Sequence, residues 1–190
     1  MQNSSKKFFF SRNGYTLIET LIVALIIVTI STFVITYTRT SEKQISLSLE
    51  LENIASLIFR AKSLSLATFG ESGSPIRSCG YGLEIDYNSN SYSIFSYEPP
   101  EPISCSSIAN IAPGRRRTIK PAFSLPRGLV FERGEENMHF VLFVPPEPSV
   151  LLGSEPGGSL TAGPVNLYLE TEDGSFGRVL TVNVSGQIDF

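Results

Sequence analysis

The most chemically distinctive arrangement in this chain is a glutamate directly before an apolar run. Residues 14–19 read Gly-Tyr-Thr-Leu-Ile-Glu, and residues 20–38 carry no charge and are rich in Leu, Ile and Val. An ionised carboxylate that enters a membrane segment loses its water and regains nothing unless a cation meets it. We therefore expect Glu19 to pair with a positive group at the same depth.

Residues suited to enzyme chemistry are scarce. The chain has one histidine, His139, two cysteines and no tryptophan. Catalytic triads and metal cages need several such side chains at defined spacings, and His139 has no Cys or carboxylate at ligand spacing. A lone histidine beside Met138 and Phe140 is typical of a packed or surface residue. We predict that the protein is not an enzyme and has no catalytic residue, no metal site and no cofactor.

The apolar run is long enough to span a membrane. As a helix, residues 20–38 would extend roughly 29 Å, which is close to the hydrocarbon thickness of a bilayer. A cleaved secretory signal is the alternative, but the run is longer than a usual signal core and no Ala-x-Ala site follows it. The first 14 residues carry basic residues and no acid, so we expect a single pass with the N-terminus in the cytoplasm and the remainder outside. These basic residues are Lys6, Lys7 and Arg12, whereas Glu42 accompanies Arg39 and Lys43 after the run.

The string from Gly14 to Glu19, placed before an apolar helix, closely resembles the prepilin signal of type IV pilins and type II secretion pseudopilins. This resemblance covers residues 1 to about 38. It implies that a prepilin peptidase cuts after Gly14 and methylates the new N-terminus, the amine of Tyr15. Tyr15 stands where phenylalanine is commonest in the family, and no proline precedes Pro75. The missing helix proline favours a minor pilin or a pseudopilin.

The resemblance also implies a role for Glu19, which in this family meets the N-terminal amine of a neighbouring subunit. Cleavage after Gly14 creates an ammonium group at the depth where Glu19 needs a cation. Once such a pair is buried, removal of one partner costs about 3 to 5 kcal/mol. The partners implied are prepilin peptidase, other pilin or pseudopilin subunits, an inner-membrane assembly platform and, before assembly, membrane lipid.

The helix is predicted to continue beyond the membrane. Neither Gly nor Pro interrupts residues 15–69, so we expect one helix of about 55 residues, roughly 80 Å long, stopped by Gly70, Gly73 and Pro75. The predicted parts are a leader (1–14), a transmembrane and assembly helix (15–38), an amphipathic continuation (39–70) and a β-rich head (71–190). The apolar face of the continuation is spaced by three and four, and consists of Leu47, Leu51, Ile54, Ile58, Ala61 and Leu64.

After Pro75 the apolar period changes to two, which predicts strands. Alternating residues from Tyr81 to Tyr87, a turn at 88–90 and a second run from Tyr92 to Tyr97 predict a hairpin. A helix packed on an antiparallel sheet gives an α+β fold class. The segments 99–126 and 145–164 are rich in Pro, Gly and Ser and are predicted to be loops. Further strands are expected at 129–132, 139–144, 165–170, 177–184 and 187–190, with late turns at 173–174 and 185–186.

Cys79 and Cys105 flank the predicted hairpin. An extracytoplasmic head lies in an oxidising compartment, where a disulfide between them would contribute about 3 to 4 kcal/mol in the chain-entropy model. The alternative is a pair of buried thiols in an organism whose exported proteins stay reduced.

A basic segment stands out in a chain with 15 basic and 18 acidic residues, a balance that argues against a global nucleic-acid binder. It could attract DNA phosphates, as in a minor pilin of a competence system. The favoured alternative is a solvated loop or a contact with acidic neighbours. Its residues are Arg115, Arg116, Arg117 and Lys120, with Arg127 and Arg133 further on.

Two functions follow from the sequence. The leading hypothesis is a structural subunit that is processed by a prepilin peptidase and assembled through its N-terminal helix. The rival is a monomeric membrane-anchored binding domain that keeps its leader. Secretion, DNA uptake, adhesion and motility all stay open as the activity of the assembled machine.

Overall fold

The computed structural model describes residues 16–70, 78–99, 105, 108–119, 122–134, 137–145 and 149–190. Gly14, Tyr15 and Lys120 therefore lie outside the described residues. The chain divides into two compact units, one up to Ser41 and one from Glu42 to Phe190. We call the second unit the head. It contains the last part of the long helix together with the strands.

Helix α1 (Leu17–Gly70) has 54 residues, as the lack of Gly and Pro predicts. Thr16 caps its first turn, because its Oγ1 accepts a hydrogen bond from the Glu19 N–H at 3.3 Å. In the head, the face predicted to be apolar is the buried face. Five of its residues, Leu47, Leu51, Ile54, Ile58 and Ala61, are buried, and Leu64 packs partly buried against the same cluster.

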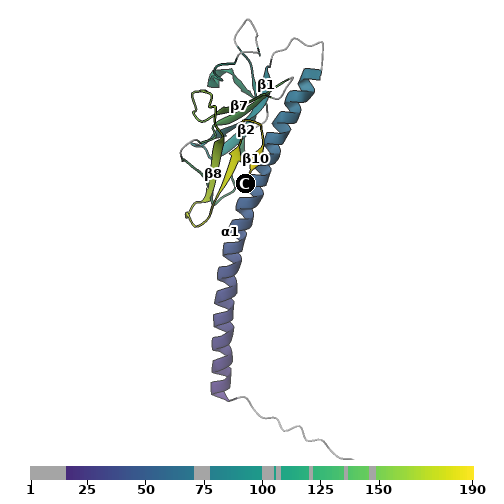
Figure 1. The fold of residues 1–190 in the computed structure, drawn as a ribbon. Helices are drawn as coiled ribbons and strands as arrows, with labels where there is room; N and C mark the ends of the chain where they lie inside the picture. The colour runs from purple at the N-terminus through teal and green to yellow at the C-terminus, as the bar shows by residue number, and fades with distance from the viewer. Residues whose placement is uncertain are drawn as a thin grey trace, which may run out of the picture. The chain divides into compact units, whose positions relative to one another are not determined.

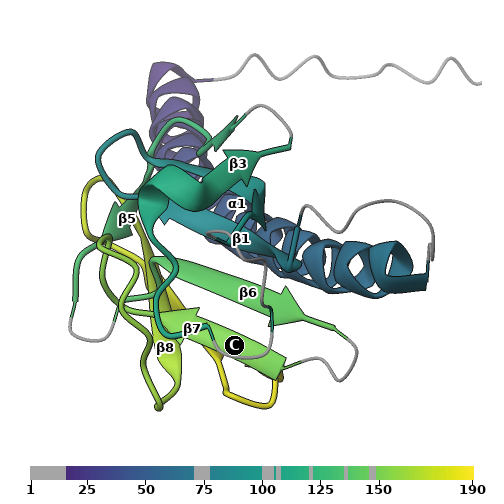
Figure 2. The ribbon, with the colours of Figure 1, turned by 90° about the horizontal axis from the view of Figure 1, so that it is seen from above.

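The head contains two antiparallel sheets (Figures 1 and 2). The larger has the order β3-β2-β1-β6-β7, with β4 also paired to β2, and the smaller has the order β10-β9-β8-β5. The strands of the larger sheet are β1 (Gly80–Asp86), β2 (Ser91–Tyr97), β3 (Arg116–Thr118), β4 (Phe123–Ser124), β6 (Phe140–Val144) and β7 (Ser149–Gly153). Those of the smaller are β5 (Leu129–Glu132), β8 (Val165–Thr171), β9 (Gly177–Val182) and β10 (Ile188–Asp189). A short 3-10 helix, η1 (Pro113–Arg115), precedes β3.

The predicted α+β class and the first hairpin are confirmed, because β1 pairs with β2 in the register Leu83 to Ile94. The prediction that 99–126 and 145–164 are loops is wrong in part. The first contains β3 and β4, and the second contains β7. Proline and glycine flank these strands without interrupting their ladders, so the composition of the segments concealed them. Strand β7 pairs along its whole length with β6, from Phe140 opposite Gly153 to Val144 opposite Ser149.

The main core lies between the helical part of the head and the two sheets. Figure 1 shows both sheets on the same side of this part of α1. Two buried polar contacts join the helix to the larger sheet. The Tyr92 hydroxyl donates to Glu50 Oε1 at 2.7 Å, and the Ser65 hydroxyl donates to the Phe143 carbonyl at 2.6 Å. The apolar partners include Leu83, Ile94 and Val141 from the larger sheet and Leu167, Leu169 and Leu180 from the smaller.

A second core covers the opposite face of the larger sheet. All of β6 is buried, with Val141 and Phe143 facing the main core and Phe140, Leu142 and Val144 facing the second. The segment around Ile111 packs over this outer face. The larger sheet is therefore enclosed on both sides at β6, whose sequence Phe-Val-Leu-Phe-Val is apolar throughout.

Candidate functional site

The N-terminal part of α1 exposes its apolar side chains. Among the described residues, α1 is the one helix long and apolar enough to cross a membrane, with a mean hydropathy of 2.5 in its most apolar window. Its large hydrophobic residues from Leu17 to Tyr37 are between 48% and 83% exposed. A helix that is apolar on every side is stable only when lipid or protein surrounds it. This segment therefore requires an apolar environment.

Four threonine hydroxyl groups of this segment are satisfied within the helix. Thr29, Thr32, Thr36 and Thr38 each donate to a backbone carbonyl three or four residues earlier, at 2.9 to 3.0 Å. A hydroxyl bonded in this way needs no water, so it can enter an apolar environment at little cost. The threonines are therefore compatible with a lipid or protein surrounding.

Glu19 lies in the first turn of α1 and is exposed. Thr16 and Glu19 have the spacing of a capping box, and the Thr16 hydroxyl makes its half of that motif. The positive end of the helix dipole also favours a carboxylate in the first turn. Among the described residues, no cation forms an ion pair with Glu19. Its predicted partner, the amine of Tyr15, lies outside the described residues.

Cys79 and Cys105 form a disulfide, as predicted, with their Cα atoms 5.3 Å apart. Cys79 is buried just before β1, and its N–H donates to the Tyr97 carbonyl at 2.8 Å. Cys105 and Ile108 pack against the second core. The bridge therefore ties Cys105 to the start of β1, a central strand of the larger sheet, and holds it against the second core.

Arg116 does not belong to a surface patch, and it contacts an acidic neighbour, as the favoured alternative expects. Its side chain is 3% exposed. The Nη1 atom donates to Glu84 Oε1 at 2.5 Å, and Nε and Nη2 donate to the Ile111 carbonyl at 3.0 and 2.8 Å. Its guanidinium also lies over the ring of Phe140, with Cζ 4.4 Å from the ring centroid. Arg116 is an internal cation that joins β3 to β1 and to the segment around Ile111.

Arg117 points the other way, because side chains alternate along β3, whereas Arg115 is the last residue of η1. Arg115 is exposed, and Arg117 is 73% exposed with Nη1 3.6 Å from Glu98 Oε1. The contact with Glu98 matches the expected alternative of an acidic neighbour. Lys120 lies outside the described residues, and DNA contact by Arg115, Arg117 and Lys120 stays a prediction.

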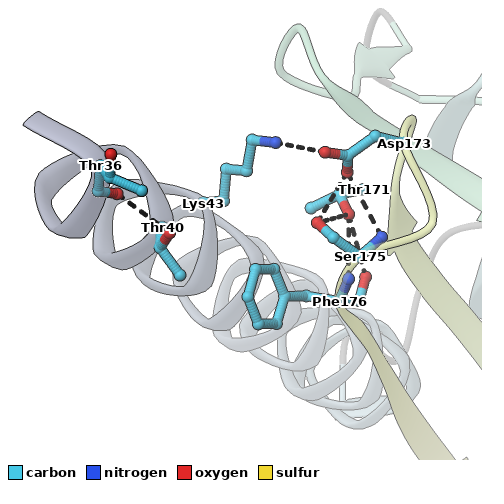
Figure 3. A network of polar contacts seen from close by, with 7 residues as sticks. All are labelled: Thr36, Thr40, Lys43, Thr171, Asp173, Ser175 and Phe176. Carbon is cyan, nitrogen blue, oxygen red and sulfur yellow. Dashed lines mark hydrogen bonds and ion pairs between the residues drawn. The ribbon is translucent and has the colours of Figure 1, made fainter.

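A polar network joins the start of the head's helix to the β8–β9 turn (Figure 3). The Lys43 ammonium donates to Asp173 Oδ2, while Asp173 Oδ1 accepts from the Ser175 N–H and hydroxyl. The Phe176 N–H donates to Thr171 Oγ1 at 3.1 Å. The Lys43 contact, with help from Ser175, holds the pKa of Asp173 far below its ordinary value. Both charges are about half exposed, so the pair positions the turn more than it stabilises it.

His139 lies half-buried beside a polar groove at the end of the β1–β2 hairpin. Its ring centroid is 4.9 Å from that of Tyr87, whose hydroxyl donates to the Met138 carbonyl at 3.1 Å. Burial lowers the pKa of His139, and the charges of Arg116 and Arg133 lower it further. Within the described residues, no group of three or more His, Cys, Asp and Glu side chains could hold a metal ion.

Sequence reasoning missed two of these contacts. Glu84 is one of the polar residues that alternate with apolar ones along β1, and no local pattern links it to Arg116. The Asp173-Gly174 turn was predicted, and Gly174 has the positive φ of 65° that such a turn requires, but the contact with Lys43 was not. No local pattern links Lys43 to a residue 130 positions later.

The fold and site define an α+β protein with a long N-terminal helix whose exposed apolar part could span a membrane. No protein-family model matches the chain, and comparisons with curated proteins and with solved structures find no significant match.

Proposed function

We propose that the protein is a structural subunit of a type IV pilus or a type II secretion pseudopilus. A prepilin peptidase cleaves it after Gly14 and methylates Tyr15, and the subunit assembles through its N-terminal helix. One observation carries the proposal. The prepilin-like string that ends at Glu19 stands directly before a helix whose apolar side chains are exposed on every side.

The exposed helix needs two different surroundings in this account. Before assembly, lipid covers it, with the N-terminus in the cytoplasm and the head outside. After assembly, the helices of neighbouring subunits cover it. The threonine hydroxyls bonded within the helix suit both surroundings, because they need neither water nor a fixed partner.

Glu19 distinguishes assembly from simple anchoring. A monomeric anchor also needs an apolar helix. In such an anchor, a carboxylate at the start of the membrane segment would serve only to cap the first turn of the helix. In a filament, the carboxylate meets the amine that cleavage creates on a neighbouring subunit. An unpaired partner costs about 3 to 5 kcal/mol when buried, so the pair sets which subunit register is allowed.

The test expresses the full chain with a prepilin peptidase and the assembly machinery of its source. We expect Gly14→Val to block cleavage, since a bulky side chain replaces the residue at the cut. We expect Glu19→Gln to be cleaved normally but to leave few subunits in sheared filaments. Glu52→Gln is the matched control, because Glu52 is an exposed glutamate of the same helix outside the apolar part. Normal filaments from Glu19→Gln, or cleavage of Gly14→Val at the same site, would contradict the proposal.

A further inference from the structure

A groove with a volume of about 620 Å³ opens at the tip of the β1–β2 hairpin. This size is typical of sites that bind small molecules or single side chains of a partner. We call it the hairpin groove. The charged and titratable residues that line it are Glu84, Asp86, Tyr87, Tyr92, Arg116, Arg133 and His139.

The two carboxylates of the hairpin groove already have partners. Glu84 accepts from Arg116. Asp86 Oδ1 accepts from the Asn88 N–H at 2.9 Å, and Oδ2 accepts from the Ser89 hydroxyl at 2.7 Å. These hydrogen bonds hold the pKa of Asp86 below its ordinary value, so this carboxylate is ionised and its acceptor sites are partly occupied.

Arg133 is the second cation of the groove, and its charge also helps to lower the pKa of Asp86. Its side chain is exposed, and Nη2 donates to the neutral Asn88 Oδ1 at 2.5 Å. Among the described residues, no carboxylate forms an ion pair with it. A guanidinium has five N–H donors in a planar fork, so donors remain for a ligand.

Burial and two arginine charges act on His139. Arg116 and Arg133 both lower the pKa of this imidazole, and the opposite effect of Glu155 is smaller than either. Burial lowers it further, so the ring is neutral near pH 7. An anion that enters this end of the groove therefore gains from the field, and a cation does not.

We propose that the hairpin groove binds a carboxylate-bearing ligand, with Arg133 as its charge partner and His139 beside the carboxylate. A single negative charge fits better than a multiply charged phosphate, because Glu84 and Asp86 line the same groove and repel additional negative charge. The fork of a guanidinium matches the two oxygens of a carboxylate. This site does not depend on whether the chain assembles into a filament.

The chain has a single histidine, so one set of imidazole signals reports on the groove. The experiment labels the full chain with ¹⁵N-histidine in detergent micelles and titrates glutarate by NMR. Two parallel titrations at the same ionic strength serve as comparisons. One uses glutaramide, the uncharged analogue of glutarate, and the other uses inorganic phosphate. We expect a saturable shift with glutarate and a rise in the pKa of His139, because a nearby carboxylate favours the protonated ring. The charged and titratable groups around this ring are Glu84, Asp86, Tyr87, Arg116, Arg133 and Glu155.

Variants of two arginines distinguish binding at the hairpin groove from nonspecific electrostatic attraction to the protein. Arg133→Gln should weaken glutarate binding about tenfold or more, since a charge-assisted hydrogen bond is lost. Arg133→Lys should retain only part of the affinity, because lysine keeps the charge and loses the planar fork; the part that is retained shows that the hairpin still folds. Arg178→Gln, at an exposed arginine of β9 that does not line the groove, should bind as the original chain does. Equal shifts with glutaramide, tighter binding of phosphate, or equal losses at Arg133 and Arg178 would overturn the proposal.

Discussion

Replacement of Arg116 by methionine should destabilise the head strongly. Methionine keeps the unbranched stem beside Phe140 but removes the charge that faces Glu84 and the donors to the Ile111 carbonyl. Breaking a buried pair costs about 3 to 5 kcal/mol when the remaining charge is fully enclosed. Glu84 is 30% exposed, so water relieves part of this penalty. We expect a loss of about 3 kcal/mol, which lowers the midpoint of thermal unfolding by roughly 6 to 12 °C.

The adjacent arginine provides the control. Arg117 is 73% exposed and lies 3.6 Å from Glu98, so Arg117→Met should cost about 0.5 kcal/mol or less. Urea unfolding of the full chain in detergent, followed by near-ultraviolet circular dichroism of the tyrosines, measures both losses. The double variant Glu84→Gln with Arg116→Met should lose less than the sum of the two single variants, because neither charge is left alone. Equal losses at Arg116 and Arg117 would refute the assignment of an internal cation.

Three further predictions concern the head. Reduction of the Cys79–Cys105 disulfide should lower the free energy of unfolding by about 3 to 4 kcal/mol, measured by urea unfolding with and without reductant; an unchanged midpoint would contradict this value. Gly82→Ala should destabilise the head by about 1 to 3 kcal/mol or more, because the new Cβ would lie 2.1 Å from a backbone oxygen and 2.8 Å from the Phe95 ring. Gly114 has open space around it, so Gly114→Ala should change the midpoint of unfolding little. The pKa of Asp173 is lowered in the folded state from its ordinary value of 3.8. The contribution of Asp173 to the free energy of unfolding is therefore complete above pH 3.8 and is lost as the pH falls toward the folded-state pKa. Asp173→Asn should therefore flatten the fall in stability below about pH 4, and an unchanged acid profile would exclude this role.

The local elements of the fold could be predicted from sequence because each has a strong periodic signal. The absence of Gly and Pro specified α1, and strict alternation specified the hairpin from Gly80 to Tyr97. Strand β7, with the sequence Ser-Val-Leu-Leu-Gly, is short, and neighbouring Pro and Gly made its segment resemble a loop. Only its partner β6 makes it a strand, and pairing between distant segments leaves no local pattern.

The same limit applies to the basic segment, where composition could not separate the buried Arg116 from its exposed neighbours. Arg115, Arg116 and Arg117 are identical as letters, and composition alone treats them as one positive patch. The geometry separates them, because Arg116 points toward Glu84 and two aromatic rings while its neighbours point outward. A buried arginine requires a carboxylate and a carbonyl in place, and here these come from β1 and from the segment after the disulfide. The cleavage string, by contrast, is a contiguous motif and needs no tertiary structure to be recognised.

The N-terminus of the protein isolated from its native membrane tests the central claim most directly. Intact mass and N-terminal peptide sequencing can measure the cut and the methyl group together. The proposed function predicts a chain that begins at Tyr15 and carries one methyl group on its amine. A chain that begins at Met1, or one cut after the apolar run, would contradict it.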